Sequence, residues 1–386
     1  MRDAKPRPSA GSGAYPSFHL GYEMTGVDLM YDIAVVGAGP AGATFARLVA
    51  DRYKVLVIDK RLFPDTSKSF AAGKCCGGLL APDAQRMLSS LGLGLPKEVL
   101  EEPQLFVVRA IDIPQRIERY YQRHYINIHR QKFDRWLLHL VQPNVDIRLG
   151  WRLRTCAAED DGFRLVFSQG ASTCTEKARI LVGADGASSS VRKLLAPTAA
   201  QPRTYIAIQE WVETESPMPY FSSIFDPQLT DFYCWTIPKD RHLIVGAALD
   251  PRDNTSEKFN RLKSMLGDFG FRIGKTVWRE GAFLLRPMRT GQVTTGGAGM
   301  ALIGEAAGLI SPSSAEGLSY AFSSAMLLAT AVSDSLHGFE KRYAEATTRL
   351  RRNIFLKNLK SHFIFNPSLR KLVMRSGLSA LDLQLP

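Results

Sequence analysis

The sequence predicts an α/β fold with a parallel sheet, interrupted by an inserted antiparallel α+β portion and followed by a helical C-terminal segment. Three observations predict this class. Residues 33–36 form a short apolar run that leads into a glycine-rich turn and a helical stretch, which is typical of a buried parallel strand. The same order of strand, glycine-rich turn and helix returns at residues 300–321. Between these units, residues 203–290 alternate short strands with loops.

The first glycine-rich turn, residues 37–42, has the composition of a dinucleotide-binding turn. Gly37 allows the tight turn, Gly39 lets the backbone approach a pyrophosphate, and Gly42 lets the helix pack closely on the strand. A second apolar run, residues 54–58, ends at Asp59, which is placed to accept a hydrogen bond from a ribose hydroxyl. An ordinary βα turn could carry the same glycines, but the strand, the helix and the acid together favour a Rossmann-like nucleotide site.

Composition and charge limit the possible classes of protein. The chain has 386 residues, 45% of them hydrophobic and 22% charged, which is enough for two or three globular domains. Its five cysteines have no metal-ligand spacing and favour a reducing compartment, so we expect a cytoplasmic protein without a metal site. Residues 1–29 lack the apolar segment of a signal peptide and are expected to form a disordered tail.

The net charge of +12 is concentrated near the C-terminus. Residues 337–386 hold ten Lys or Arg against three acids. Such a cluster is compatible with nucleic acid, with an anionic membrane surface or with a solvated helical face. No nucleic-acid motif accompanies it, so we expect no nucleic-acid partner. No apolar run approaches the roughly 20 residues of a membrane span, and any membrane contact is expected to be peripheral.

Between the first and second glycine-rich turns, the pattern predicts a series of short elements. These are a helix at 82–92, strands at 105–113 and 120–128, a helix at 130–138, and a meander of strands at 145–149, 152–157, 163–167 and 178–182. The second turn, residues 183–192, follows the last of these strands. Its Asp185 either contacts a cofactor or caps the next helix.

Two further stretches of the sequence are candidate ligand contacts. Residues 74–80 place adjacent cysteines before two glycines, which is equally compatible with close approach to a ligand and with a turn that buries small thiols. The third glycine-rich turn, residues 304–318, lies far from the first in sequence, and one extended cofactor could contact both.

The order of the three turns resembles the FAD-binding fold of the aromatic hydroxylases. In that family the first turn holds the pyrophosphate and the third contacts the ribityl chain and the flavin ring. Arg130 stands in a pattern similar to the family's Arg-x-x-apolar-Asp and is by analogy a cofactor-side arginine. The resemblance covers residues 30–335 and shifts the expected cofactor to FAD.

Two segments are more similar to the geranylgeranyl reductase family. Residues 74–79 resemble its Cys-Gly-Gly element, and residues 233–238 resemble its Tyr-x-Trp-x-Phe-Pro segment, with Ile237 in place of Phe. Glu305 departs from the Asp of the wider group. Flavin-dependent halogenases are the nearest competitor, since their aromatic segment differs only at Tyr233, but their Gly-Glu-Ser element is absent from this sequence.

The resemblance implies a reaction and a set of residues. We expect reduced FAD to reduce a carbon–carbon double bond of a prenyl or other apolar substrate, with NAD(P)H or a reduced electron carrier as reductant. Alternatives are a halogenase or monooxygenase, and a non-catalytic flavoprotein. The candidate catalytic residues are Cys76, Tyr233 and Trp235. The candidate FAD-binding residues are Gly37, Gly39, Pro40, Ala41, Gly42, Asp59, Lys60, Lys74, Cys75, Gly77, Gly78, Arg130, Asp185, Gly304, Glu305, Gly308, Pro312, Gly317 and Leu318.

The predicted domain organisation follows from the same pattern. We expect an FAD-binding domain built from residues 30–102, 129–200 and 286–336. Residues 103–128 and 201–285 are expected to form the inserted substrate domain. Residues 337–386 are expected to form a basic helical segment, which could hold the protein at the inner face of a membrane.

Overall fold

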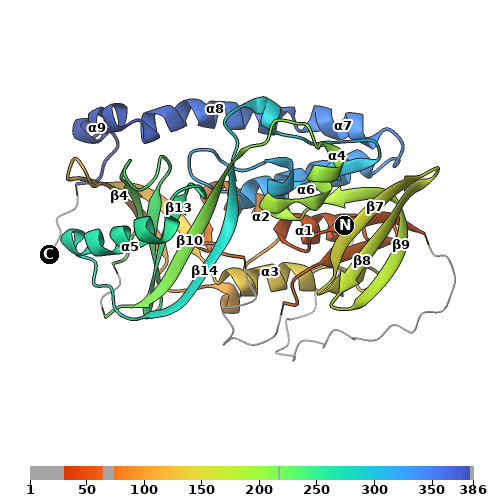
Figure 1. The fold of residues 1–386 in the computed structure, drawn as a ribbon, viewed down its shortest axis with the longest axis horizontal. Coiled ribbons are helices and arrows are strands. Elements are labelled where there is room, and N and C mark those ends of the chain that lie inside the picture. Colours follow the sequence, from red (N-terminus) through yellow and green to blue (C-terminus); the bar gives the residue numbers. More distant parts are fainter. Residues whose placement is uncertain (1–29, 64–73, 216–217, 383–386) are drawn as a thin grey trace, which may run out of the picture.

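A computed structural model describes residues 30–63, 74–215 and 218–382 of the chain (Figure 1). The expected tail at residues 1–29 lies outside the described residues. Two eight-stranded sheets lie at opposite ends of an elongated molecule, and helices cover them (Figure 1). The predicted fold class is confirmed: a mixed α/β nucleotide-binding portion is joined to a largely antiparallel one. Whether each portion is an independent domain stays a prediction.

The first sheet has a parallel centre. Its order is β15 (Gly296–Gly297), β16 (Met300–Leu302), β9 (Ser172–Gly183), β1 (Tyr31–Val36), β2 (Val55–Asp59) and β6 (Asp146–Leu149). The central strand β1 pairs in parallel with β2 and β9, and its burial on both faces explains its continuous apolar sequence. The hairpin of β7 (Arg152–Glu159) and β8 (Gly162–Gln169) joins this sheet through antiparallel pairing of β8 with β9.

One sequence expectation about this sheet is wrong. Residues 145–149 were expected to begin the meander, but β6 pairs in parallel with β2 and only β7 to β9 form the meander. Gly150, with a φ of +82°, turns the chain away between β6 and β7. Asp146 is held at β1 by the Tyr31 hydroxyl, which donates to it at 2.6 Å. The strand with which β6 pairs is therefore determined by contacts between residues far apart in the sequence.

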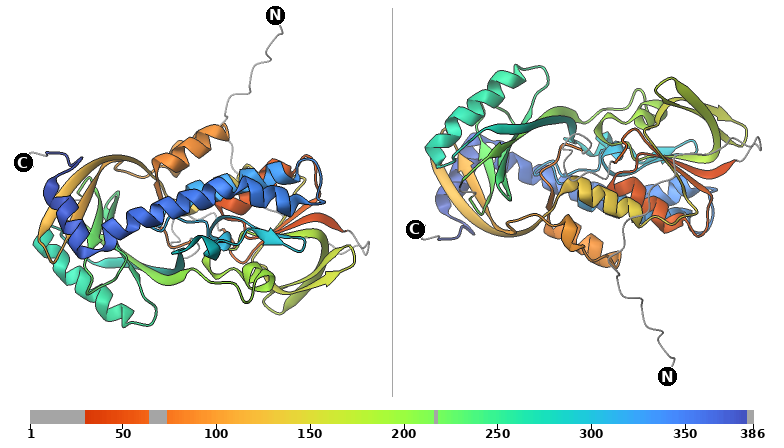
Figure 2. Two further views of the ribbon diagram at one scale, coloured as in Figure 1. Left: turned by 90° about the horizontal axis from the view of Figure 1, so that it is seen from above. Right: turned by 90° about the horizontal axis from the view of Figure 1, so that it is seen from below.

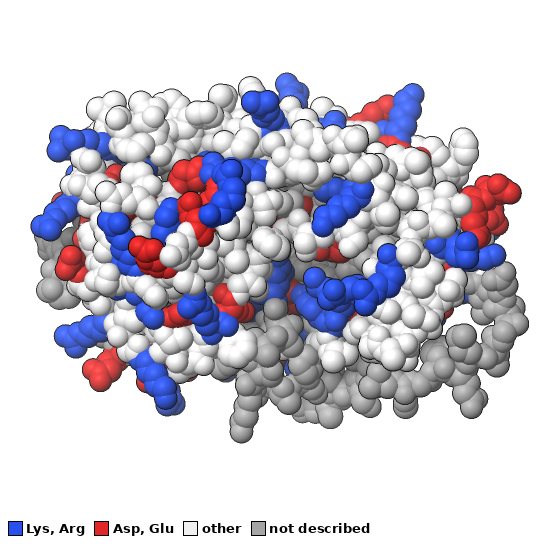
Figure 3. Space-filling view, in the orientation of Figure 1, with Lys and Arg blue, Asp and Glu red and all other residues white. Residues whose placement is uncertain are grey.

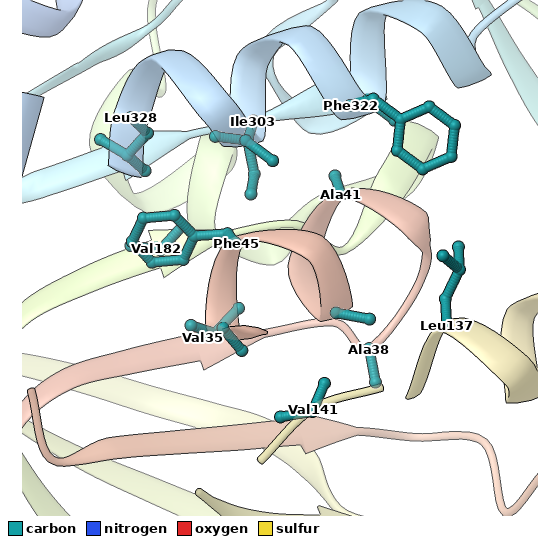
Figure 4. Close-up of a cluster of buried hydrophobic side chains, with 14 of the residues drawn as sticks. Val35, Ala38, Ala41, Phe45, Leu137, Val141, Val182, Ile303, Phe322 and Leu328 are labelled. Carbon is teal, nitrogen blue, oxygen red and sulfur yellow. The ribbon is translucent and has the colours of Figure 1, made fainter. Parts of the chain in front are cut away.

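The core of the nucleotide-binding portion forms around α1 (Pro40–Val49). This helix lies between β1 and α6 (Leu318–Val332), with Ala41 and Phe45 packed among side chains from both elements (Figure 4). A Cβ on Gly42 would lie 1.8 Å from the Gly37 carbonyl oxygen, so the glycine is required for this close packing. Further cover comes from α2 (Pro82–Ser90) and α3 (Arg130–His139), both predicted from the sequence.

The second sheet is antiparallel except for one pair. Its order is β14 (Thr276–Arg286), β10 (Arg203–Glu213), β13 (His242–Leu249), β12 (Cys234–Lys239), β11 (Phe221–Phe225), β4 (Leu105–Asp112), β5 (Ile117–Asn127) and β3 (Leu79–Leu80). Only β11 and β4 are parallel. Helix α5 (Thr255–Leu266) covers one face by packing Phe259 and Leu262 against apolar side chains of the sheet.

Three C-terminal helices form one layer along the upper side of the molecule (Figures 1 and 2). They are α7 (Phe339–Ala346), α8 (Thr348–Phe365) and α9 (Pro367–Ser376). At the first sheet, the Tyr343 hydroxyl donates to the Leu302 carbonyl at 3.0 Å. At the second, Arg370 donates to Asp112 at 2.8 Å, so the layer is fixed to both sheets. No helix among the described residues is long and apolar enough to cross a membrane.

Candidate functional site

A cavity of about 1210 Å³ runs between the two sheets and beneath α8 and α9. All three glycine-rich turns border it, together with residues 74–79 and the aromatic segment. The structure therefore brings together most of the residues selected from the sequence. Those that line the cavity are Gly37, Gly39, Pro40, Ala41, Asp59, Lys60, Lys74, Cys75, Cys76, Gly77, Gly78, Arg130, Asp185, Tyr233, Trp235, Gly304, Glu305, Gly317 and Leu318.

Three of the predicted FAD-binding residues do not line it. Gly42 lies behind the first turn, where its role is the helix packing described above. Gly308 ends a short 3-10 helix with a φ of +78°, and a Cβ there would point at the Gln292 carbonyl. Pro312 is turned so that its carbonyl accepts from the Arg286 Nε at 3.1 Å. These residues hold the turns in place from outside the cavity.

The first turn fits a bound pyrophosphate. Gly37 has a φ of +110°, and a Cβ there would lie 2.4 Å from the Ala184 carbonyl oxygen, so protein contacts explain this glycine. They do not explain Gly39: its φ is −72°, and the nearest atom to a Cβ there is 3.6 Å away. Gly39 is also the N-cap of α1 without a side-chain cap, which leaves the first N–H groups of the helix to bind phosphate oxygens. The space next to Gly39 is therefore open to a pyrophosphate, as the sequence predicts.

The carboxylate of Asp59 is held by the protein itself. It accepts from the Ala38 N–H at 2.8 Å and from the Arg61 Nη2 at 2.8 Å. Burial alone would raise the pKa of Asp59, but the bonds from Arg61 and Ala38 outweigh burial and keep the pKa below its usual value. The other carboxylate oxygen accepts from the Arg61 N–H at 2.8 Å and from the Arg61 Nε at 3.1 Å. All four lone-pair positions of the carboxylate are therefore occupied, and a ribose hydroxyl could bind only by displacing one of these donors.

Arg61 is a site residue that the sequence reasoning missed. It bridges Asp59 to Asp134, at 3.2 Å from the latter, and lines the cavity. Asp134 in turn accepts from the Arg130 Nε at 2.6 Å. Burial would lower the pKa of Arg130, but Asp134 and Cys76 outweigh it and raise the pKa above its usual range. The only sequence signal for Arg61 was its place two residues after the acid at the end of β2.

At the second turn, Asp185 caps the following helix, which is one of the two roles expected from the sequence. Its carboxylate accepts from the Ser190 N–H at 2.6 Å and the Val191 N–H at 3.4 Å, at the start of α4 (Ser190–Leu195). Burial raises the pKa of Asp185, partly opposed by these bonds. Asp185 also lines the cavity, so capping does not exclude a cofactor contact.

At the third turn, Glu305 forms an ion pair with Lys74 inside the cavity wall. Its other oxygen accepts from the Leu285 N–H at 3.1 Å. The longer side chain, in place of the wider group's Asp, thus links this turn to β14 of the second sheet and to the segment that precedes Cys75. The N-terminus of α6, at Gly317 and Leu318, faces the same cavity.

The sequence left open whether residues 75–78 approach a ligand or bury small thiols, and the structure shows one cysteine in each situation. Cys75 is buried and donates to the Ala207 carbonyl at 3.7 Å, and burial raises the pKa of its thiol. Cys76 is half-buried and lines the cavity. Gly78 has a φ of +63°, and a Cβ there would lie 2.2 Å from the Ile128 carbonyl oxygen. Cys75 is thus a buried thiol, whereas Cys76 is accessible to a ligand.

Lys239, another missed residue, supports this loop from behind. It is fully buried at the end of β12 and donates to the Gly78 carbonyl at 3.2 Å and the Ile128 carbonyl at 2.8 Å, as well as to Asn127. Burial lowers the pKa of Lys239 to about 7, with Glu101 opposing the shift. No local sequence signal marks this lysine, because its partners are 111 and 161 residues away.

The two aromatic candidates have different surroundings. The Tyr233 hydroxyl donates to the Ser314 carbonyl at 2.8 Å, and burial raises the pKa of Tyr233 above its usual range. Tyr233 therefore stays protonated and fixes the third turn. Trp235 lies over Gly246 of the neighbouring strand, where a Cβ would come within 2.2 Å of the indole. Gly246 makes room for the Trp235 ring in the cavity wall.

Comparison with known proteins agrees with this geometry. Residues 30–347 match the family model described as "FAD binding domain". The chain is 41% identical over 349 residues to Protein CbrA of Escherichia coli O157:H7, covering 90% of this chain and 97% of CbrA.

Solved structures show the same fold at low sequence identity. A geranylgeranyl bacteriochlorophyll reductase-like protein from Thermoplasma acidophilum matches with a TM-score of 0.76, 19% identity and 92% coverage of both chains. The halogenase PltM matches with a TM-score of 0.68 and 16% identity, covering 90% of this chain and 80% of PltM.

The family match covers most of the chain, and the cavity contains a glycine-lined helix N-terminus that fits a pyrophosphate. The expectation of FAD is thereby confirmed. The chain belongs to the FAD binding domain family.

Proposed function

We propose that the protein reduces a carbon–carbon double bond of an apolar substrate, such as a prenyl chain. The observation that carries this proposal is the cavity beyond the glycine-rich turns. At about 1210 Å³ it exceeds the roughly 300–1,000 Å³ that is usual for a single ligand, so a second molecule fits beside the cofactor.

The wall of that further part is largely apolar and contains no acid, although Arg123, Gln209 and Lys360 also line the cavity. Side chains from the second sheet and the C-terminal helices form it, namely Ala110, Phe221, Phe225, Trp235, Ile364 and Met374. The acidic lining residues, Asp59, Asp185, Glu305 and Glu316, all lie on or beside the glycine-rich turns. Arg370 also reaches the wall, but its charge is balanced by Asp112. An uncharged apolar substrate suits such a wall because no buried ionic group loses its partner.

When bound and reduced, FAD would supply a hydride to one carbon of the double bond, while the neighbouring carbon takes a proton. The chain's own residues bind and orient: the N-terminus of α1 and Arg130 lie at the cofactor end, and Trp235 forms a wall at the substrate end. The apolar side chains exclude water from the reacting carbons. Of the three candidate catalytic residues, Cys76 is half-buried and lines the cavity, whereas the Tyr233 hydroxyl is bonded to the Ser314 carbonyl. We therefore place Cys76 at the reacting end.

The test is a product screen with purified, FAD-loaded protein that has been reduced anaerobically with dithionite or NAD(P)H. Saturated products from polyprenyl alcohols or their diphosphates are expected. Products that form only when halide and oxygen are present would replace the proposal with a halogenase, and oxygenated products without halide would indicate a monooxygenase. A flavin-loaded protein that converts no alkene in any of these conditions would favour a non-catalytic role.

A further inference from the structure

Helices α8 and α9 present large apolar side chains on the surface of the protein. Leu356 is 61% exposed and Leu372 is 68% exposed. We define the C-terminal apolar strip as the exposed apolar residues of both helices, which are Phe355, Leu356, Leu359, Phe363, Leu369, Leu372 and Val373. This surface differs from the charged outer face that a surface helix normally presents to water.

The strip is the outermost face of the two helices. Ile354, Asn358 and Ser361 are the buried residues of α8, and their helical spacing places them on the side opposite to the strip. Arg370 and Met374 form the corresponding inner face of α9. Seen from above, α8 and α9 lie in front of both sheets, and no other described element covers them (Figure 2).

Basic residues accompany the strip. Helices α8 and α9 together contain eight Lys or Arg and no Asp or Glu. Three of these cations are committed to the protein: Arg370 to Asp112, Lys357 to Asp83, and Arg351 to the Val293 carbonyl. The other five form no ion pair with a described residue, and they are Arg349, Arg352, Lys360, Lys371 and Arg375. In the space-filling view, blue side chains project from this upper edge among uncharged ones (Figure 3).

We propose that α8 and α9 dock on the surface of an anionic lipid bilayer. Insertion of the C-terminal apolar strip into the boundary between headgroups and acyl chains would bury its side chains, while the flanking cations contact lipid phosphates. A second copy of the chain fits this surface less well, because a symmetric contact would place the same unpaired cations of both copies together. Nucleic acid would satisfy the cations but leave the exposed leucines and phenylalanines in water.

Docking in this way would bring the cavity to the bilayer. Lys360, Phe363 and Val373 are exposed residues of the docking helices, and all three line the cavity. An apolar substrate dissolved in the bilayer could then enter beneath α8 and α9 without crossing water. This consequence rests on the proposed function, whereas the docking itself does not.

The test measures co-sedimentation of the FAD-loaded full-length protein with vesicles of phosphatidylcholine, with and without phosphatidylglycerol. Binding is expected only with the anionic lipid and should weaken as salt is added. The double variant Arg352→Glu with Arg375→Glu should bind about tenfold more weakly or worse. A matched control, Arg272→Glu with Lys275→Glu, makes the same charge change on an exposed loop away from α8 and α9 and should bind as wild type.

A second pair of variants tests the apolar strip. Leu356→Ser with Leu372→Ser should lose binding, whereas the control Leu48→Ser with Leu194→Ser alters leucines that are 40% and 44% exposed elsewhere and should not. Each variant is checked for flavin content and thermal unfolding, so a folding defect is recognised. Absence of binding at low salt, equal binding to neutral vesicles, or equal losses in the controls would overturn the proposal. A wild-type dimer that the Leu356 and Leu372 changes convert to monomers would assign the surface to a second copy instead.

Discussion

The clearest test of the cofactor site compares two glycines of the same turn. Gly39→Ala should leave the apoprotein intact, because its backbone is extended, with φ −72° and ψ −175°, and a Cβ there meets only Arg61 at 3.6 Å. The expected change in the free energy of unfolding is within about 1 kcal/mol. A methyl group in the path of the pyrophosphate, however, costs about 1–3 kcal/mol of overlap, so the affinity for FAD should fall about 5- to 150-fold.

Gly42→Ala is the matched control, since the same methyl group is added three residues later. Its Cβ would lie 1.8 Å from the Gly37 carbonyl oxygen, which forces α1 away from the turn. The expected loss is about 3 kcal/mol or more of apoprotein stability, together with loss of FAD binding.

The assay combines thermal unfolding of both apoproteins, followed by circular dichroism, with titration of FAD by quenching of its fluorescence. Gly39→Ala should lower the affinity for FAD without lowering the melting temperature of the apoprotein. Gly42→Ala should lower both. If Gly39→Ala bound FAD as tightly as wild type at an unchanged melting temperature, the pyrophosphate would not pass over Gly39. The explanation of the first turn would then be wrong.

Three further predictions concern the substrate end of the cavity and the buried lysine behind the loop at Gly78. Gly246→Ala should displace the Trp235 indole and raise KM for an apolar substrate severalfold while the FAD content is unchanged; unchanged kinetics would remove Trp235 from the substrate wall. Cys76→Ala should lower turnover with FAD still bound, and wild-type rates would remove Cys76 from the site. For Lys239, with a pKa of about 7 in the folded state and about 10.4 unfolded, the unfolded chain binds more protons between these values, so its contribution to stability rises with pH. Lys239→Met should reduce the gain in melting temperature from pH 7 to pH 9, and an identical gain in both proteins would contradict the shift.

Much of the nucleotide-binding portion could be predicted because its signals are local. Residues 33–59 specify a buried strand, a turn that needs glycine and a helix start, all within a short stretch of chain. Helix α3 was likewise predicted from apolar spacing alone. The second sheet was expected as alternating strands, but its order could not be predicted, since strands with similar patterns offer many pairings.

The candidate site was predictable where residue type is forced by backbone shape or ligand approach. Gly37, Gly39 and Gly304 all border the cavity as expected. Gly308 and Pro312 do not, although they lie in the same motif, because the direction in which a turn residue faces depends on what packs behind it. Arg61 and Lys239 were missed for a related reason: a cation carries no pattern of its own, and its role appears only once its partners are placed.

The sequence by itself determined that this protein contains a dinucleotide-binding turn followed by two further glycine-rich turns, because glycine spacing constrains the local backbone. It also showed that the C-terminal segment is basic and helical in composition. Only the tertiary structure decided that Tyr233 is committed to Ser314 and that Lys239 supports the loop at Gly78. It also showed that α8 exposes Phe355, Leu356, Leu359 and Phe363 at the surface. Hydrogen-bond partners and exposed faces depend on contacts between residues far apart in the chain, and no local pattern encodes them.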